Sequence, residues 1–339
     1  MSCTLLPGSG ETRHEYSLYG LRVQIDRPLG GLSARSGNGS QTVRVCFTSP
    51  PAWTEEATSG PMLVRFDSGD AIGDLPASLC VWTYAESGAF RLAYRDGVEF
   101  IMDRDGRRIS VRQSATGLAD HAASYLLGMV LGFSLRLQGR LALHASTIVV
   151  DDRAVVLLGE SGSGKSTAAA TFAEAGYEVL ADNMCVPVEL EGEFRAECGY
   201  PGIRLWPDSV QSIFGSAEAL PRIAHGWDKR YLDLSRGKYR FGAESRPIGA
   251  FYWLGKNRRI GDASTTEPLS PSDLMMKLVA ASYPEDLIDA EMRAGEFDVL
   301  ARLAESIPGR MVSVREDLSS MAGTCDAIVE DFRALHTIR

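Results

Sequence analysis

The strongest constraint on the fold is a glycine-rich stretch in the middle of the chain, Gly159-Glu160-Ser161-Gly162-Ser163-Gly164-Lys165-Ser166-Thr167. It satisfies the P-loop pattern G-x-x-x-x-G-K-[ST] at every position. An apolar run at 155–158 precedes it, as a buried strand would, and the Ala-rich segment 167–175 favours a helix that ends at Gly176. A strand, a glycine loop and a helix N-terminus in this order form a cradle for phosphate.

The P-loop pattern predicts that the protein binds the cofactors ATP and Mg²⁺. Lys165 is expected to reach the β- and γ-phosphate oxygens, and the hydroxyl of Ser166 to hold Mg²⁺. The alternative is an ordinary glycine-rich turn between a strand and a helix. The residues predicted to bind the nucleotide are Gly159, Ser161, Gly162, Ser163, Gly164, Lys165, Ser166 and Thr167.

Length and composition limit the class of protein. A chain of 339 residues suggests about two domains, and 45% hydrophobic with 23% charged residues is typical of globular proteins. The net charge of −9 argues against a nucleic-acid partner. The N-terminus is polar and the most apolar stretch, 122–135, is too short to span a bilayer, so neither a signal peptide nor a membrane partner is expected. Six scattered cysteines without metal-ligand spacing predict reduced thiols and a cytoplasmic protein. The sequence is compatible with a homo-oligomer.

Residues 1–118 are predicted to form a small β-rich N-terminal domain with an antiparallel sheet. Asp-Gly pairs between apolar runs, at 96–97 and 105–106, are strong hairpin signals. Segments 29–41 and 50–61 are rich in Gly, Ser and Pro, which predicts loops. No catalytic constellation is visible here. The β-prone runs are 18–25, 42–47, 78–83, 90–94, 99–102 and 108–111.

Residues 119–339 are predicted to form an α/β domain. Segment 119–137 is expected to be a long apolar helix that bridges the two halves, 141–150 a strand bearing His144, and 177–181 a strand that ends at Asp182. Ligands of open α/β sheets bind at the carboxyl ends of strands, so the P-loop and Asp182 are expected to meet there. The later elements are a loop entering a helix at 199–208, strands at 229–234, 249–254 and 311–314, and helices at 270–281, 296–306 and 324–335.

The order and spacing of three features resemble the catalytic core of bacterial HPr kinase/phosphorylase and the related phosphoenolpyruvate carboxykinases. His144 precedes Lys165 by 21 positions, and Asp182 follows Lys165 by 17. The resemblance implies that residues 119–339 form an α/β P-loop kinase domain of this type. It also implies catalytic roles for Asp182, His144 and Lys165, and metal contacts from Ser166, Asp182 and Asn183. The alternative for Asn183 is a turn residue without a metal role.

Longer segments resemble a divergent branch of HPr-kinase-like proteins. They lie at 125–128, 139–146, 204–208 and 229–232. Members of that branch occur in lasso-peptide biosynthetic clusters and phosphorylate a serine of the precursor peptide. The resemblance therefore implies a serine kinase whose partner is a peptide or protein with an acceptor serine, such as a lasso-peptide precursor.

Two departures from the family pattern favour the forward reaction. Asn183 stands where the family has a second Asp, and the Arg-Gly-Leu-Gly signature associated with phosphorolysis is absent downstream. Two alternatives to a serine kinase would have the same nucleotide site. One is an ATP-binding regulatory or assembly protein without transfer activity, and the other is a small-molecule kinase. Arg204, Lys229 and Arg230 are expected to be solvated or paired surface charges, with contact to phosphate or substrate as the alternative for any one of them. Trp206 is expected to pack rather than to bind a base.

Overall fold

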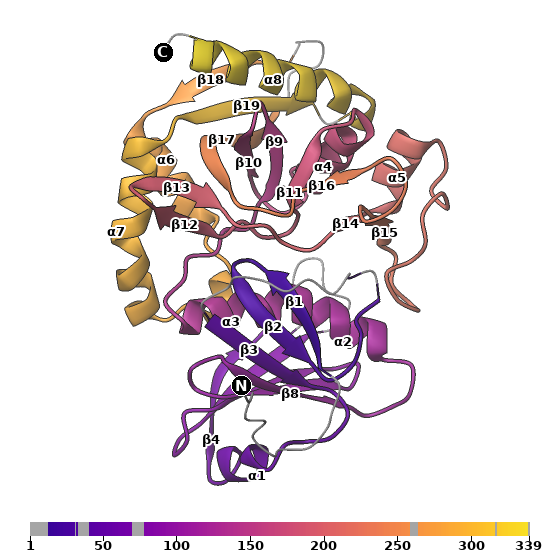
Figure 1. Ribbon diagram of the computed structural model, residues 1–339, viewed down its shortest axis with the longest axis vertical. Coiled ribbons are helices and arrows are strands. Elements are labelled where there is room, and N and C mark those ends of the chain that lie inside the picture. The colour runs from indigo at the N-terminus through magenta and orange to yellow at the C-terminus, as the bar shows by residue number, and fades with distance from the viewer. Residues whose placement is uncertain are drawn as a thin grey trace, which may run out of the picture.

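The computed structural model describes residues 13–30, 32, 41–69, 78–257, 264–315 and 317–337. It is a mixed α/β structure built around two large sheets, one formed by strands before residue 114 and the other by strands after residue 145 (Figure 1). Within the described residues, no helix combines the length and the apolar character needed to cross a membrane.

The first sheet has eight strands in the order β1-β2-β3-β8-β7-β6-β5-β4. The Asp-Gly hairpins are confirmed, since β6–β7 and β7–β8 are antiparallel pairs. The prediction that this sheet is antiparallel throughout is wrong, because β3 pairs in parallel with both β2 and β8. Fifteen residues connect β2 to β3, enough for a crossover. The strands are β1 (His14–Leu18), β2 (Leu21–Ile25), β3 (Gln41–Cys46), β4 (Met62–Asp67), β5 (Leu79–Tyr84), β6 (Phe90–Tyr94), β7 (Val98–Met102) and β8 (Arg108–Gln113).

Two loop predictions fall in this half. The predicted loop 50–61 contains a short helix, α1 (Trp53–Ala57), in which the hydroxyl of Thr54 donates to the carbonyl of Pro51 at 2.6 Å. The predicted loop 29–41 lies largely outside the described residues. Strands β1 and β4 were not predicted.

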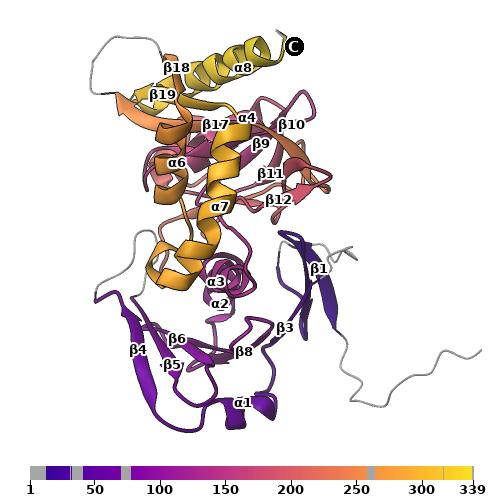
Figure 2. The same cartoon turned by 90° about the vertical axis from the view of Figure 1, so that its left-hand side faces the viewer.

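The predicted helix 119–137 is confirmed and contains a π-helical turn. It consists of α2 (Ala119–Tyr125), the π turn (Leu126–Val130) and α3 (Leu131–Leu137). The ring of Tyr125 stacks on that of Tyr94 at 3.6 Å, and Phe133 meets Phe90 edge-on at 5.0 Å. The helix lies between the first sheet and the rest of the molecule (Figure 2). Its residues share one apolar core with the first sheet, and the boundary at residue 118 stays a prediction.

The second sheet has nine strands, with the principal order β12-β13-β17-β10-β9-β11-β16; β19 pairs with β17 and β18. Strand β10 is parallel to β17 and antiparallel to β9. The strands are β9 (Ser146–Val150), β10 (Arg153–Leu158), β11 (Glu178–Ala181), β12 (Pro187–Leu190), β13 (Glu193–Ala196), β16 (Arg240–Phe241), β17 (Arg246–Asn257), β18 (Thr266–Leu269) and β19 (Gly309–Arg315). A separate two-stranded sheet pairs β14 (Gly202–Leu205) with β15 (Arg230–Asp233).

Helices cover both faces of the second sheet. Along β10, Val155 and Leu157 belong to the core formed with α4 and α8, whereas Val156 and Leu158 belong to the core formed with α6 and α7. A strand buried on both faces accounts for the uninterrupted apolar run before the P-loop. The helices are α4 (Lys165–Glu174), α5 (Pro207–Phe214), α6 (Pro271–Ala280), α7 (Ala290–Ser306) and α8 (Met321–Thr337).

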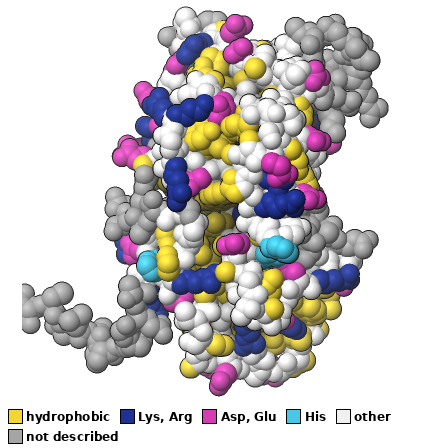
Figure 3. Space-filling model, turned by 90° about the vertical axis from the view of Figure 1, so that its right-hand side faces the viewer, with side chains coloured by type: hydrophobic (Ala, Val, Ile, Leu, Met, Phe, Trp, Pro, Cys, Tyr) yellow, Lys and Arg dark blue, Asp and Glu magenta, His cyan; other side chains and the backbone are white. Residues whose placement is uncertain are grey.

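The strand predicted at 141–150 starts later, at Ser146. Ser146 pairs with Leu157 near the end of β10, so the preceding residues have no partner on that strand. Leu143 instead bridges to Cys185 and Ser282. His144 therefore precedes β9 rather than lying on it. On the face shown in Figure 3, acidic and basic side chains are intermixed and apolar atoms lie between them.

Candidate functional site

The loop between β10 and α4 requires glycine at two of its positions. Gly159 has φ +148° and Gly164 has φ +97°, both in the region that favours glycine. A Cβ at Gly159 would lie 2.5 Å from Ser163 Oγ and 2.9 Å from the carbonyl oxygen of Leu254. A Cβ at Gly164 would lie 2.9 Å from Met321 Cε. The backbone of the loop is thus closely confined by its surroundings.

Two side chains of the loop are buried, and one of them, Lys165, suits an anionic ligand. Lys165 is buried, and its Nζ donates to the carbonyls of Gly159 at 2.8 Å and Glu160 at 2.9 Å, which keeps the ammonium against the loop. The hydroxyl of Ser163 is buried and has no hydrogen-bond partner among the described residues. An unsatisfied buried hydroxyl costs about 1–3 kcal/mol. The Oγ of Ser163 lies beside Gly159 rather than on the open side of the loop, so the fit to phosphate rests on the Lys165 ammonium and the loop N–H groups.

Asp182 lies directly after β11 and is 1% exposed. Its Oδ1 accepts hydrogen bonds from Ser166 Oγ at 3.0 Å and from Ser146 Oγ at 2.6 Å. Strand β9 is antiparallel to β10 and β11, so its first residue lies at the same edge as their carboxyl ends. The structure thus brings Asp182 to the P-loop, as expected. Ser146 was missed because it sits in an apolar run.

The other two predicted residues lie beside Asp182. Asn183 has φ +75°, a left-handed conformation that Asn tolerates better than most residues. A Cβ at Gly128 would lie 3.5 Å from Asn183 Nδ2, which places this amide next to the π turn. The ring of His144 is 5.6 Å from the ring of Tyr283, and its backbone N donates to the carbonyl of Ala281 at 2.6 Å.

Arg204 is held within the site instead of lying in solvent. Its Nη2 donates to the carbonyl of Ser124 on α2 at 2.9 Å, and its backbone N lies 3.5 Å from Asp182 Oδ2. Burial acts to lower the pKa of this guanidinium, but the nearby phenols of Tyr200 and Tyr283, with other acidic groups, hold the pKa above its ordinary value. Arg204 therefore remains charged beside Asp182, contrary to the expected surface position.

The first sheet reaches the site through Tyr19, in the turn between β1 and β2. Its backbone N donates to the carbonyl of Cys198 at 2.6 Å, and its hydroxyl approaches the carbonyl of Asp182 at 3.5 Å. Burial raises the pKa of the phenol well above its ordinary value, so Tyr19 stays neutral. No sequence signal pointed to this residue, because its role depends on contact between distant segments.

Two cavities meet at the site. The loop cavity, of about 250 Å³, is lined by the P-loop, the start of α5 and Leu318. The adjacent cavity, of about 270 Å³, is lined by residues of α2, the π turn and segments 223–229 and 280–286, together with Asp182 and Asn183. Five residues line both cavities: His144, Ser161, Ser166, Arg204 and Lys229. A group bound at this junction would contact the P-loop on one side and the adjacent cavity on the other.

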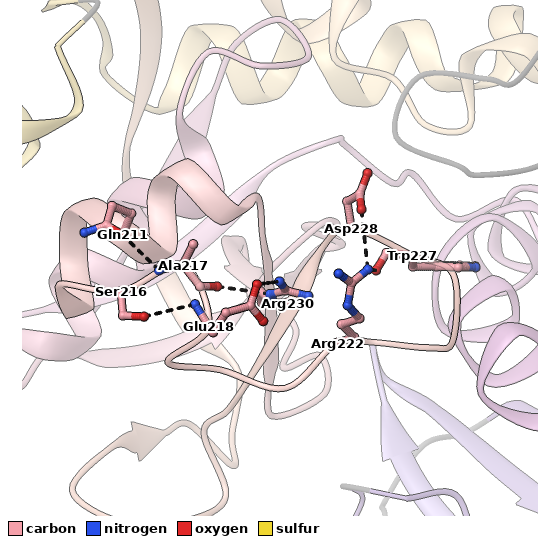
Figure 4. A network of polar contacts seen from close by, with 8 residues as sticks. All are labelled: Gln211, Ser216, Ala217, Glu218, Arg222, Trp227, Asp228 and Arg230. Atoms are coloured by element: carbon pink, nitrogen blue, oxygen red, sulfur yellow. Dashed lines mark hydrogen bonds and ion pairs between the residues drawn. The ribbon is translucent and has the colours of Figure 1, made fainter.

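A polar network joins residues of the loop between α5 and β15 (Figure 4), and part of this loop lines the adjacent cavity. Arg230, 2% exposed, pairs with Glu218 and donates from Nε to the carbonyl of Ala217 at 3.1 Å. Arg222 Nη1 donates to the carbonyl of Trp227 at 3.0 Å. Arg230 is thus a buried structural residue, and the expectation of a surface charge was wrong.

The residues predicted to bind metal form a small donor set. Among the described residues, no group of three or more His, Cys, Asp or Glu side chains is placed to hold a metal ion. Mg²⁺ bound together with a nucleotide commonly uses only one or two carboxylates, its other ligands being phosphate and water. The Asp182 carboxylate and the Ser166 hydroxyl, in mutual contact, suit that mode. The metal roles of Ser166, Asp182 and Asn183 remain predictions.

No family model matches the sequence, and no curated protein matches it. Among solved structures, the chain is similar to the Hpr(Ser) kinase/phosphatase from Coxiella burnetii, with a TM-score of 0.32 and 11% sequence identity. The match covers 58% of this chain and 99% of that chain. A similarity this distant leaves the function to be inferred from the site itself.

Proposed function

We propose that the protein is an ATP- and Mg²⁺-dependent kinase that transfers the γ-phosphate to a serine hydroxyl of a peptide or protein. One observation carries this proposal. The buried carboxylate of Asp182 is hydrogen-bonded to Ser166 of the P-loop, beside the junction of two cavities. A binding protein needs the loop cavity alone, whereas transfer also needs space for an acceptor and a base beside it.

The loop cavity suits the triphosphate. Its loop N–H groups and the N-terminus of α4 favour anionic oxygens, and Lys165 adds a positive charge. Lys165 would exchange its bonds to the carbonyls of Gly159 and Glu160 for phosphate oxygens. When bound, Mg²⁺ neutralises phosphate charge, and Ser166 with Asp182 would hold it.

The adjacent cavity suits the acceptor hydroxyl. The hydroxyl oxygen forms a bond to the γ-phosphorus while the bond from that phosphorus to the bridging oxygen breaks, and ADP leaves. Asp182 accepts the hydroxyl proton, late in a loose transition state. Arg204 and His144 line the junction and would contact the transferred group. Most of the rate enhancement then comes from positioning and charge stabilisation.

The acceptor class follows from the resemblance described above, which implies a serine of a peptide or protein such as a lasso-peptide precursor, in the cytoplasm. The volume of the adjacent cavity, about 270 Å³, is also compatible with a second candidate. This space accepts one side chain of a peptide, and it equally accepts a small hydroxylated metabolite. A small-molecule kinase is therefore the alternative to test.

The experiment is a screen with γ-labelled ATP and Mg²⁺. Candidate acceptors are serine-containing peptides, their alanine counterparts, and small hydroxylated acids and sugars. Label transferred to serine peptides but not to alanine peptides supports the proposal, and label on a small molecule supports the second candidate. Tight ATP binding without transfer to any acceptor would overturn both and leave an ATP-binding regulatory protein.

A further inference from the structure

We propose that the exposed indole of Trp206 is the surface on which the base of the bound nucleotide stacks. This inference rests on the proposed function, because it assumes that the P-loop binds a nucleoside triphosphate. Trp206 lines the loop cavity and is 44% exposed, although it was expected to pack. Large aromatic side chains bury much of their surface in most folds, so an indole open to a ligand cavity requires an explanation.

The direction of the nucleotide follows from the two cavities. The Ser166 hydroxyl and the Lys165 ammonium of a P-loop serve the β- and γ-phosphates, and here Ser166 contacts Asp182 at the junction. The γ-phosphate end therefore points toward the adjacent cavity. The α-phosphate and the nucleoside must leave in the other direction, through the part of the loop cavity that does not border Asp182. That part is lined by Trp206, Asp208, Ser209 and Leu318.

The backbone that carries the indole is connected to the P-loop. Trp206 precedes α5 in an extended conformation, φ −70° and ψ 152°, which the following Pro207 favours. Helix α5 is joined to α4 through a 2.8 Å hydrogen bond between the hydroxyls of Ser209 and Thr167. Thr167 is itself part of the P-loop motif. The phosphate cradle and the residue that carries the aromatic ring are thus connected directly, and a site that is already formed binds at a lower entropic cost.

A positive charge lies over one face of the indole and also borders the junction, which leaves the other face for a base. Lys229 Nζ is 4.9 Å from the centre of the Trp206 ring, and Lys229 lines both cavities. A cation over an aromatic ring is attracted to its face. A nucleotide has the same sequence of chemical features, an aromatic base joined to anionic phosphates. The indole therefore corresponds to the base, and the cationic P-loop corresponds to the phosphates. Leu318 supplies an apolar contact in the same cavity.

The test compares two ligands that differ only in the nucleoside. Calorimetry measures the affinity of the full-length protein for Mg–ATP and for Mg–tripolyphosphate. Loss of stacking on one aromatic ring lowers affinity by about 5- to 150-fold. Trp206→Ala should lower the affinity for Mg–ATP by this factor and leave that for tripolyphosphate within about twofold. Trp206→Phe, which keeps an aromatic face, should retain most of the ATP affinity.

A matched control and two opposing outcomes complete the design. Phe297→Ala removes another exposed aromatic ring, 60% exposed on α7 and outside both cavities, and should change neither affinity. An unchanged ATP affinity in Trp206→Ala, or equal losses for both ligands, would overturn the stacking proposal while leaving the P-loop assignment intact. A parent protein that binds neither ligand would overturn the nucleotide site and this inference together.

Discussion

Replacing Asp182 by Asn tests the proposed base with little change of shape. The amide oxygen can still accept from Ser146 and Ser166, whose hydroxyls lie 2.6 and 3.0 Å from Oδ1. The amide nitrogen would then face the backbone N of Arg204, which is 3.5 Å from Oδ2, so a donor would meet a donor. The substitution removes the negative charge and the proton-accepting oxygen, and it leaves the P-loop in place.

The expected effect on catalysis is large and the effect on folding is modest. A positioned base contributes about 10²–10⁴-fold, so the transfer rate should fall by this factor. The affinity for ATP should fall much less, since Lys165 and the loop amides remain. Weakening two charge-assisted hydrogen bonds should lower the free energy of unfolding by about 1–3 kcal/mol, and removal of a buried charge offsets part of this loss.

The assay is phosphorylation of an acceptor peptide followed by mass spectrometry over a series of Mg²⁺ concentrations. If Asp182 also holds Mg²⁺, more metal should recover part of the lost rate, whereas a base alone would give no recovery. Ser146→Ala is the matched control, because it removes one hydrogen bond to Asp182 but keeps the carboxylate. Its rate should fall by about tenfold at most.

An Asp182→Asn variant as active as the parent would show that Asp182 is not the base. Equal losses of activity in Ser146→Ala and Asp182→Asn would show the same, since the carboxylate would then act only through the local structure. Urea unfolding of each variant separates loss of catalysis from loss of folded protein.

Four further predictions concern other parts of the chain. Lys165→Ala should weaken Mg–ATP binding well beyond the loss of a surface charge, because the ammonium is buried in the loop; calorimetry would show an unchanged affinity if this is wrong. With Asn183 in place of an acid, phosphorylated product incubated with inorganic phosphate should release pyrophosphate only slowly; efficient release would contradict this. Glu296→Ala leaves the buried guanidinium of Arg136 without its acidic partner, so urea unfolding should show a loss of about 3–5 kcal/mol; a loss below 1 kcal/mol would contradict it. Burial raises the pKa of Cys185 to about 12, so its thiol stays protonated at pH 8 and iodoacetamide should label it only after denaturation, as peptide mapping would reveal.

Local patterns predicted the elements that are determined by neighbouring residues. The P-loop strand and helix, the Asp-Gly hairpins and the cap of α6 all follow from short-range chemistry. For example, Ser270 Oγ accepts from the backbone N of Asp273 at 3.1 Å, as a capping residue should. The meeting of the P-loop and Asp182 was also predicted, because the carboxyl ends of parallel strands share one edge of a sheet.

Features that depend on distant segments were not predicted. Nothing in the sequence shows that β9 lies between β10 and β11, so Ser146 could not be placed beside Asp182. Tyr19 reaches the site from a turn 163 positions away from Asp182, and no spacing rule covers such a contact. Arg230 resembles a surface residue in sequence, and only its burial beneath the 215–229 loop reveals its structural role.

The helix over residues 119–137 has a practical consequence for dividing this protein into fragments. Its apolar residues pack on the first sheet, and Arg204 is anchored to the carbonyl of Ser124 on the same helix. A fragment that starts at residue 119 would therefore expose the rings of Tyr125 and Phe133 to water, and a fragment that starts at residue 138 would lose the anchor of Arg204. Neither cut leaves both a covered apolar surface and a complete adjacent cavity. The helix is the wall of the site, and the β-rich half is the cover that this wall requires.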